Sequence, residues 1–159
     1  MTFMADIRHL AQVLCVVLTP LLVSSCSDSS DLGNNLFLLE GDKKEDRVIV
    51  YCTGKDFSGC YSGSYMIPTY NEHMKNGSYN EYVELVHFDK NWIIVRSVQM
   101  EPSSRNYWIV NKNFGFDWSK CDEFDCIEAI RSKIIGPLNY TDYRVKKDSL
   151  DIELEFVSN

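Results

Sequence analysis

The sequence predicts an α+β domain with a mostly antiparallel β-sheet, a meander of strands followed by one or two C-terminal helices and a final strand. Runs of β-branched and aromatic residues, separated by short polar turns, occupy residues 36–111 and are typical of strands. From residue 122 the apolar residues recur at helical spacing, and the last segment alternates apolar with acidic residues. Strands followed by helices indicate the α+β class.

Three apolar segments predict the first half of the sheet. Residues 36–39 form a first strand that ends at a Glu-Gly-Asp turn, and residues 47–52 form a second, β-branched strand. Residues 60–67 predict a third, weaker strand. Residues 68–80 are polar and rich in Asn, so we expect a long loop there.

The second half of the sheet is predicted as a meander. Residues 82–88 and 92–98 are β-type runs joined by Asp-Lys-Asn at 89–91, a connection of suitable length for a hairpin. After a polar turn at 101–106, residues 107–111 supply the next strand.

The C-terminal part is predicted to begin with an amphipathic helix. Phe124, Ile127, Ile130 and Ile134 would lie on one helical face, and the Gly-Pro pair at 136–137 is expected to end the helix.

A short second helix is predicted over residues 142–148, with Thr141 as its cap. Residues 150–156 then alternate apolar side chains with Asp and Glu, which predicts a final strand with one face in solvent.

The N-terminal segment has the pattern of a bacterial lipoprotein signal. Residues 10–23 carry no charge but are too few to span a membrane, and the small residues before Cys26 are typical of a lipoprotein cleavage site. We therefore expect a signal peptide at 1–25, lipid on Cys26, a flexible tether at 26–34 and one α+β domain at 35–159. The alternative is an ordinary secretory signal, with Cys26 as a plain thiol.

Four further cysteines follow Cys26 in an exported chain, so two disulfides are expected. Three pairings are possible, and the local pairs Cys52–Cys60 and Cys121–Cys126 are the simplest. The second pair can form only if Cys121 precedes the helix, because residues five apart within a helix are too distant. The cysteine spacing does not suit a zinc site.

Charge and motifs restrict the functions that we expect. The net charge of −7 gives no attraction to nucleic acid. The sequence holds no phosphate-binding glycine loop and no G-x-S-x-G nucleophile turn. His73 and His87 are interpreted as a loop histidine and a sheet-surface histidine, so neither a metal nor a cofactor is expected, and no catalytic residue is assigned.

Tyrosines near Gly- and Asn-rich turns are the candidates for a binding surface, because a tyrosine offers a large contact area and a hydroxyl. The candidates are Tyr61, Tyr65, Tyr70 and Tyr79. The alternative is that these rings pack within the sheet.

Several segments resemble small lipoproteins of unknown function from Gram-negative gut anaerobes. They are Cys26 with its acidic tether, residues 31–40 (DLGNNLFLLE), 89–95 (DKNWIIV), 107–112 (YWIVNK) and 136–138 (GPL). The resemblance covers most of the mature chain, but its motifs are structural and imply no catalytic residues.

Together these observations predict a lipid-anchored envelope lipoprotein at the outer membrane, with a non-enzymatic binding or structural role toward a protein or glycan partner. An immunity or inhibitor protein against an exported toxin is the alternative, and a hydrolytic enzyme is the third hypothesis. Ser149, in Asp148-Ser149-Leu150, resembles the acceptor of O-linked glycans in such bacteria.

Overall fold

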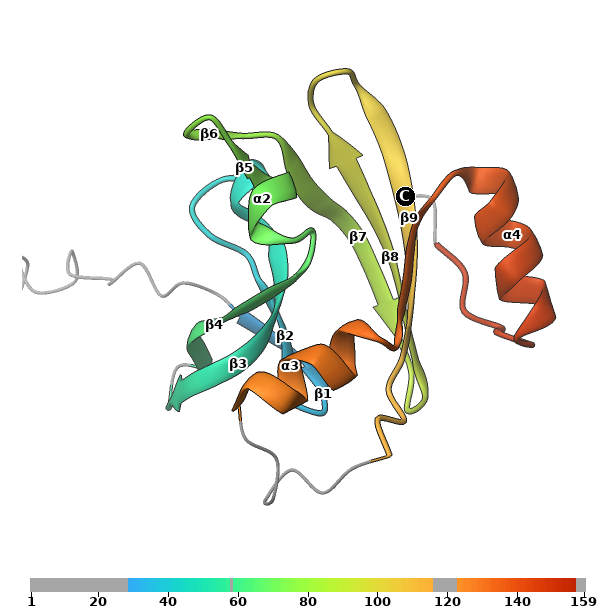
Figure 1. Cartoon of the computed structure of the whole chain (residues 1–159), viewed down its shortest axis with the longest axis horizontal. Coiled ribbons are helices and arrows are strands. Elements are labelled where there is room, and N and C mark those ends of the chain that lie inside the picture. Colours follow the sequence, from blue (N-terminus) through green and yellow to red (C-terminus); the bar gives the residue numbers. More distant parts are fainter. Residues whose placement is uncertain (1–28, 58, 116–122, 157–159) are drawn as a thin grey trace, which may run out of the picture.

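The computed structural model describes residues 29–57, 59–115 and 123–156 (Figure 1). These described residues form two four-stranded antiparallel sheets, a two-stranded sheet and several helices. The predicted α+β class, with its meander of antiparallel strands, is confirmed. None of the helices in the described part of the chain is long and apolar enough to cross a membrane.

The first sheet follows chain order, β1-β2-β3-β4. Its strands confirm the three predicted segments and add one before them. Their bounds are β1 (Ser29–Gly33), β2 (Leu36–Leu39), β3 (Val48–Asp56) and β4 (Gly59–Ile67), and the short 3-10 helix η2 (Lys44–Asp46) precedes β3.

Strand β1 corrects the expectation of a flexible tether for residues 29–33, whereas residues 26–28, with Cys26, lie outside the described residues. Ser29 pairs with Leu39 in β2, and Leu32 is buried in the core. Asn34 and Asn35 both have positive φ, which lets the chain reverse in two residues. One buried leucine and a tight turn therefore bring these polar residues into the sheet.

The second sheet has the order β10-β9-β8-β7. Strands β7 (Glu81–Phe88), β8 (Trp92–Gln99) and β9 (Ser104–Asn111) confirm the predicted meander. The carboxylate of Asp89 accepts hydrogen bonds from the backbone N–H groups of Asn91 and Trp92, both at 2.7 Å, and so fixes the β7–β8 turn.

The fourth strand is β10 (Ile134–Leu138), whereas the sequence predicted that the helix continues through Ile134 to the Gly-Pro pair at 136–137. Helix α3 (Glu123–Arg131) ends before Ile134, which instead pairs with Val110 at the edge of β9. Gly136 lies inside β10, where a Cβ atom would come within 2.6 Å of the Trp108 ring. The glycine thus permits close packing of the edge strand on β9.

The expected loop at 68–80 also contains regular structure: α2 (Tyr70–His73), β5 (Met74–Lys75) and β6 (Ser78–Tyr79). Thr69 and Glu72 form a capping box at the start of α2, with the Thr69 N–H donating to the Glu72 carboxylate at 2.9 Å. The Thr-x-x-Glu spacing was a sequence signal for this helix start.

Helix α4 (Tyr140–Ser149) confirms the second predicted helix, but its cap is Asn139 rather than Thr141. The Asn139 side chain accepts a hydrogen bond from the Asp142 N–H at 2.9 Å. The predicted final strand does not form: residues 152–156 pair with no described strand. Ile152 instead packs with Ile94 and Tyr107 on the outer face of the second sheet.

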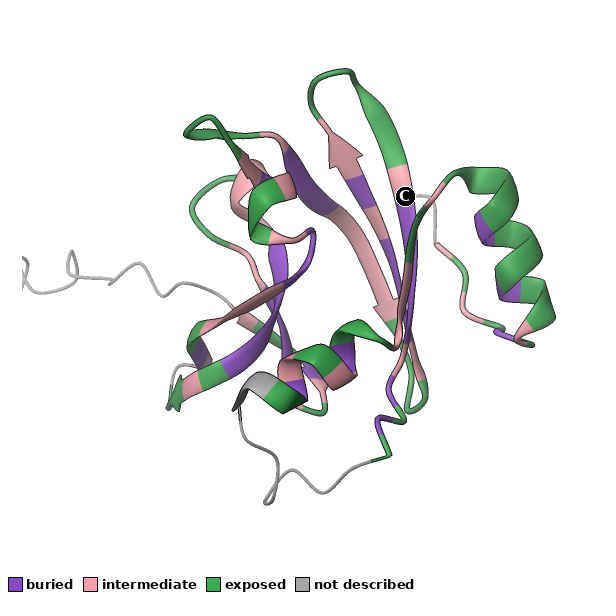
Figure 2. Ribbon diagram, viewed as in Figure 1, coloured by how far each residue is buried: buried purple, intermediate pink, exposed green. Residues whose placement is uncertain are grey.

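The main core lies between the two sheets and α3. Ile49 and Met66 of the first sheet, Val95 and Trp108 of the second sheet, and Ile130 of α3 belong to this core. The outer face of the second sheet is covered in turn by α4 and the segment after it, as the buried patches on α4 in Figure 2 show.

A disulfide joins Cys52 in β3 to Cys60 in β4, with 5.9 Å between their Cα atoms. This is the local pairing expected from the sequence. Cys121 lies outside the described residues, so its pairing with Cys126 stays a prediction.

Replacing both Cys52 and Cys60 with Ala is expected to lower the free energy of unfolding by about 2 to 3 kcal/mol, because the crosslink restricts a short loop in the unfolded chain. Urea unfolding measures the change. Ser62→Ala, at an exposed position of β4, is the control. An unfolding curve unchanged from wild type would show that the crosslink contributes no stability.

Candidate functional site

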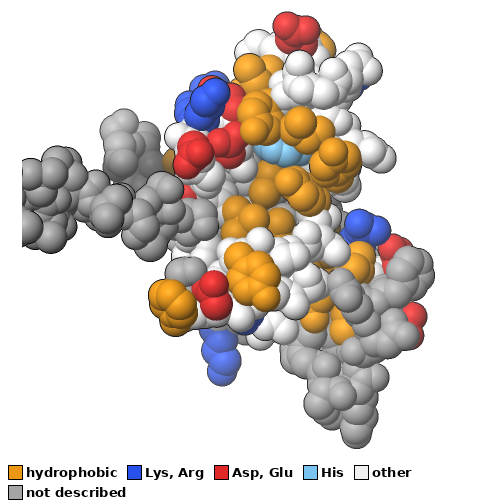
Figure 3. Space-filling view, turned by 90° about the vertical axis from the view of Figure 1, so that its left-hand side faces the viewer, with side chains coloured by type: hydrophobic (Ala, Val, Ile, Leu, Met, Phe, Trp, Pro, Cys, Tyr) orange, Lys and Arg blue, Asp and Glu red, His pale blue; other side chains and the backbone are white. Residues whose placement is uncertain are grey.

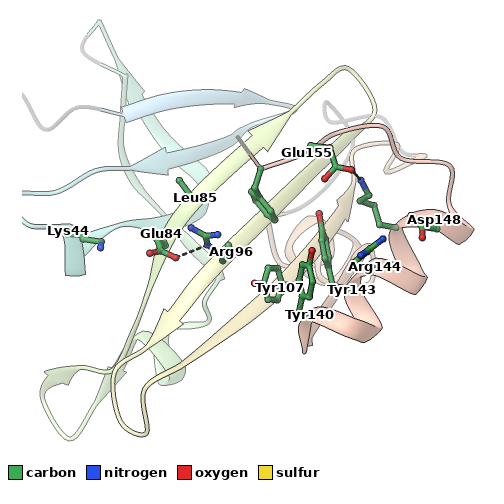
Figure 4. Close-up of a pocket in the computed structure, with 12 residues that line it drawn as sticks. Lys44, Glu84, Leu85, Arg96, Tyr107, Tyr140, Tyr143, Arg144, Asp148 and Glu155 are labelled. Atoms are coloured by element: carbon green, nitrogen blue, oxygen red, sulfur yellow. Dashed lines mark hydrogen bonds and ion pairs between the residues drawn. The ribbon is translucent and has the colours of Figure 1, made fainter. Parts of the chain in front are cut away.

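A concave site of about 700 Å³ lies between α4 and the outer face of the second sheet (Figure 4). Its volume is within the range of small-molecule binding sites. Strands β7, β8 and β9, helices η2 and α4, and the segment after α4 all contribute side chains. The aromatic and charged side chains that line it include Glu84, Arg96, Tyr107, Tyr140, Tyr143 and Arg144.

Stacked aromatic rings form one wall of this groove. The Tyr107 and Tyr143 ring centroids lie 5.0 Å apart with nearly parallel planes, and the Tyr140 centroid lies 5.4 Å from Tyr107. Phe156 extends the wall, with its centroid 5.9 Å from Tyr143. Tyr107 and Tyr143 are buried, whereas Tyr140 is 55% exposed to solvent.

Local structure accounts for the placement of these rings. Tyr140 and Tyr143 are three residues apart on α4, so they share one helix face. On β9 the alternation of side chains directs Trp108 into the core and the neighbouring Tyr107 to the outer face. Helix and strand periodicity therefore bring three tyrosines from two elements together.

The Tyr143 hydroxyl is the unusual polar group of the groove. It is buried, and it has no hydrogen-bond partner among the described residues. Burial, together with the Glu155 carboxylate, raises the pKa of this hydroxyl far above its ordinary value. A buried hydroxyl without a partner costs about 1 to 3 kcal/mol. An acceptor on a bound ligand would remove this cost.

Two carboxylates of the groove form ion pairs with Arg or Lys side chains. Glu84 forms ion pairs with Arg96 at 2.7 Å and Arg105 at 3.3 Å, and Glu155 pairs with Lys147. Burial acts to raise the pKa of Glu84, but the two guanidinium charges outweigh burial, and the pKa lies below its ordinary value. Glu84 is therefore a charged anchor for the two arginines.

Two cations of the groove, Arg144 and Lys44, form no ion pair within the described part of the chain. The Arg144 guanidinium carbon lies 6.0 Å from the Tyr140 ring centroid, and the Lys44 ammonium lies 5.3 Å from that of Tyr82. In total the groove holds four Lys or Arg and three Asp or Glu, a surplus of one positive charge in a chain of net charge −7. The site is thus locally suited to an anion.

The groove continues beyond Tyr107 and Tyr140. An adjoining depression of about 560 Å³ shares these residues and runs over Tyr82 and Arg105 toward the β8–β9 turn. The combined site is elongated, so it can hold a ligand longer than one small ring.

The tyrosines expected from the sequence lie elsewhere and line neither cavity. Tyr65 and Tyr79 lie 5.7 Å and 5.1 Å from the buried His73 ring, and Tyr70 contacts Tyr65 edge-on at 5.4 Å, so these three form one cluster. Tyr61 packs over Gly54 instead. Figure 3 shows apolar side chains gathered on this face of the molecule.

The two histidines have structural contacts. His73 Nδ1 lies 2.6 Å from the backbone oxygen of Glu81, and the His87 ring meets Phe156 edge-on at 5.9 Å. Within residues 29–57, 59–115 and 123–156, no group of three or more His, Cys, Asp or Glu could hold a metal ion.

Ser149, the predicted glycan acceptor, is exposed at the end of α4, and its hydroxyl donates to the Lys146 carbonyl at 2.7 Å. Its modification stays a prediction. The groove residues themselves were missed from the sequence, although the spacing of Tyr140 and Tyr143 beside Arg144 on one helix was a visible signal.

Comparisons with protein-family models, with curated proteins and with solved structures find no match to this chain. The resemblance to small lipoproteins therefore stays a prediction.

Replacing Glu84 with Gln is expected to lower the free energy of unfolding near neutral pH but to have a smaller effect in acid. Since folding lowers the pKa of Glu84, its carboxylate stabilises the fold above the ordinary pKa of 4.5, and this contribution is lost as the pH falls through the lower folded value. Urea unfolding of both proteins at about pH 7 and about pH 3 measures the difference. The exposed Glu153→Gln is the control, and a Glu84→Gln difference that does not shrink in acid would contradict this account.

Proposed function

We propose that this chain is a lipid-anchored envelope protein of the outer membrane that binds an acidic oligosaccharide in the groove beneath α4. The observation that carries the proposal is the buried Tyr143 hydroxyl without a partner, set in an aromatic wall beside Arg144, with Lys44 at the other end of the groove (Figure 4). The groove supplies an apolar surface, a hydrogen-bond donor and positive charge at one place.

The ligand class follows from these three properties. A sugar ring has an apolar C–H face that packs on a flat aromatic ring, and Tyr140 offers such a ring at the rim. A carboxylate on the sugar would receive hydrogen bonds from Arg144, whose guanidinium suits carboxylate geometry. Since the groove is elongated, several linked sugar units can occupy it at once.

Two of the three carboxylates that line the groove are held in ion pairs, which favours binding over hydrolysis by a carboxylate pair. Sugar hydrolysis generally uses two carboxyl groups, one of them with a raised pKa as the general acid. In this groove the pKa of Glu84 is lowered, and Glu155 is paired with Lys147. These groups hold cations in place rather than offering a proton.

The lipid anchor is the second half of the proposal. It rests on the uncharged segment at 10–23 followed by small residues and Cys26. An anchored protein remains at the outer membrane, where it meets envelope or external polysaccharide.

Replacing Tyr143 with Phe is expected to weaken binding of galacturonic acid oligosaccharides about tenfold, a loss of about 1.4 kcal/mol, because one hydrogen bond to the ligand is lost. The free energy of unfolding should stay the same or rise by up to about 1 kcal/mol, since an unsatisfied buried hydroxyl is removed. Titration calorimetry and urea unfolding measure the two effects.

Tyr70→Phe, at an exposed ring outside the groove, is the matched control. Neutral galactose oligosaccharides should bind more weakly than the acidic ones to the wild-type protein. Equal binding of acidic sugars by the wild type and Tyr143→Phe, or absence of any binding, would refute the ligand assignment.

Replacing Cys26 with Ala is expected to abolish lipidation and to leave the protein either unprocessed, with its signal peptide attached, or soluble. Membrane fractionation and intact mass of the protein expressed in a Gram-negative host measure the change. Cys15→Ala, within the predicted signal peptide, should leave both unchanged. An unaltered mass and fractionation of Cys26→Ala would overturn the lipid anchor.

A further inference from the structure

The end of the β3–β4 hairpin presents two aromatic side chains to solvent. Phe57, which follows β3, is fully exposed, and Tyr61 in β4 is 65% exposed. The Cys52–Cys60 disulfide holds the two strands together just before this end. The exposed Phe57 ring adds nothing to the stability of the fold, because an apolar ring is stabilising only when it is buried.

This hairpin end lies beside the start of the described chain. The Ser29 hydroxyl accepts a hydrogen bond from the Cys60 N–H at 3.1 Å. A Cβ atom on Gly59 would come within 2.2 Å of the same Ser29 oxygen, so β1 begins in direct contact with the hairpin.

The distance from the proposed lipid to the hairpin is limited by the covalent chain. Cys26 precedes Ser29 by three residues, which span at most about 11 Å when fully extended. The polar headgroup layer of a bilayer is itself about 5 to 8 Å thick on each side. A lipid on Cys26 therefore brings the end of the hairpin to the membrane surface.

We propose that Phe57 and Tyr61 at the β3–β4 hairpin end contact the bilayer in which Cys26 is anchored, so that the domain docks on the membrane in one orientation. This inference rests on the proposed lipidation of Cys26. Aromatic side chains are favoured at the membrane–water interface, where the tyrosine ring is apolar and its hydroxyl stays hydrated.

The positive charge of Lys55, near the hairpin end, also favours contact with a bilayer. The Lys55 ammonium donates to the Asn35 side-chain oxygen at 2.7 Å and lies 4.5 Å from the Phe37 ring centroid, so it is held near the hairpin end. An ammonium there can approach lipid phosphates while Phe57 enters the apolar boundary. Because the disulfide already restricts the hairpin, docking orders few additional residues.

The proposed docking leaves the groove accessible. In Figure 1 the β3–β4 hairpin and α4 lie on opposite sides of the molecule. A bilayer at the hairpin would therefore leave the groove beneath α4 on the side open to soluble polysaccharide.

A tryptophan reporter tests this contact in the lipid-anchored protein. Phe57→Trp is reconstituted into phosphatidylcholine vesicles, with or without bromine on the acyl chains, and its emission is compared with that of the wild type in the same vesicles. Val145→Trp is the matched control, because Val145 is 66% exposed but lies on α4. The tryptophan at 57 should lose most of its added emission in brominated vesicles and shift to the blue, while the one at 145 should do neither.

The intact mass of the same sample reports lipidation separately. If Cys26 proves unmodified, the proposed anchor fails, and a maleimide phospholipid coupled to that thiol supplies an anchor at the same residue, so the hairpin readout is still obtained. Greater quenching at 57 than at 145 supports the docking surface. Equal quenching at the two positions, or none at either, overturns it even when Cys26 carries lipid.

Discussion

Burial of both faces of the second sheet is the constraint on which the rest of this structure depends. On the inner face, Ile93 and Val95 of β8 pack into the core between the sheets. On the outer face, Ile94 joins Tyr107 and Ile109 of β9 in a separate apolar cluster. Such a sheet needs a cover on each side, because exposed apolar strands would lose their hydrophobic stabilisation. The first sheet and α3 provide one cover, and α4 with the segment after it provides the other. The groove lies where this second cover meets the sheet at Tyr107, and its exposed aromatic ring is that of Tyr140.

This constraint explains which parts of the fold could be predicted from the sequence. Strands β2 to β4 and β7 to β9 were predicted because β-branched runs and turns are local signals. The continuous apolar run at 92–95 is also typical of a strand that is buried on both faces. Such a strand needs a second layer packed on its outer face, and the sequence prediction did not include that layer. Alternation at 150–156 shows only that one face is buried. That face packs on Ile94 without backbone pairing, and the predicted strand was therefore wrong. Ile134 fits helical spacing, but it pairs with Val110 of β9 and so belongs to strand β10.

The candidate site was harder to predict because its properties arise between elements. The spacing of Tyr140 and Tyr143 was visible in the sequence, but their meeting with Tyr107 depends on how α4 crosses the sheet. The missing partner of the Tyr143 hydroxyl is a property of the packed structure alone. Sequence reasoning instead favoured tyrosines near turns. Tyr65 and its neighbours do gather in space, yet they surround a buried histidine rather than a cavity.

Strand β1 connects the fold to the proposed location of the protein. A nine-residue tether at 26–34 would let the domain rotate freely above a membrane, since a flexible chain of that length imposes little orientation. Pairing of Ser29–Gly33 with β2 leaves only three residue steps between Cys26 and a rigid sheet. In the proposed docking, the domain approaches the membrane through the first sheet, which follows Cys26 in the chain, and presents the second sheet and its groove to solvent. Leu32 is what makes this possible: it is the one apolar side chain of β1, and its burial holds the strand in the sheet. If Cys26 carries lipid as proposed, the burial of this single leucine limits the orientations that the domain can take on the membrane.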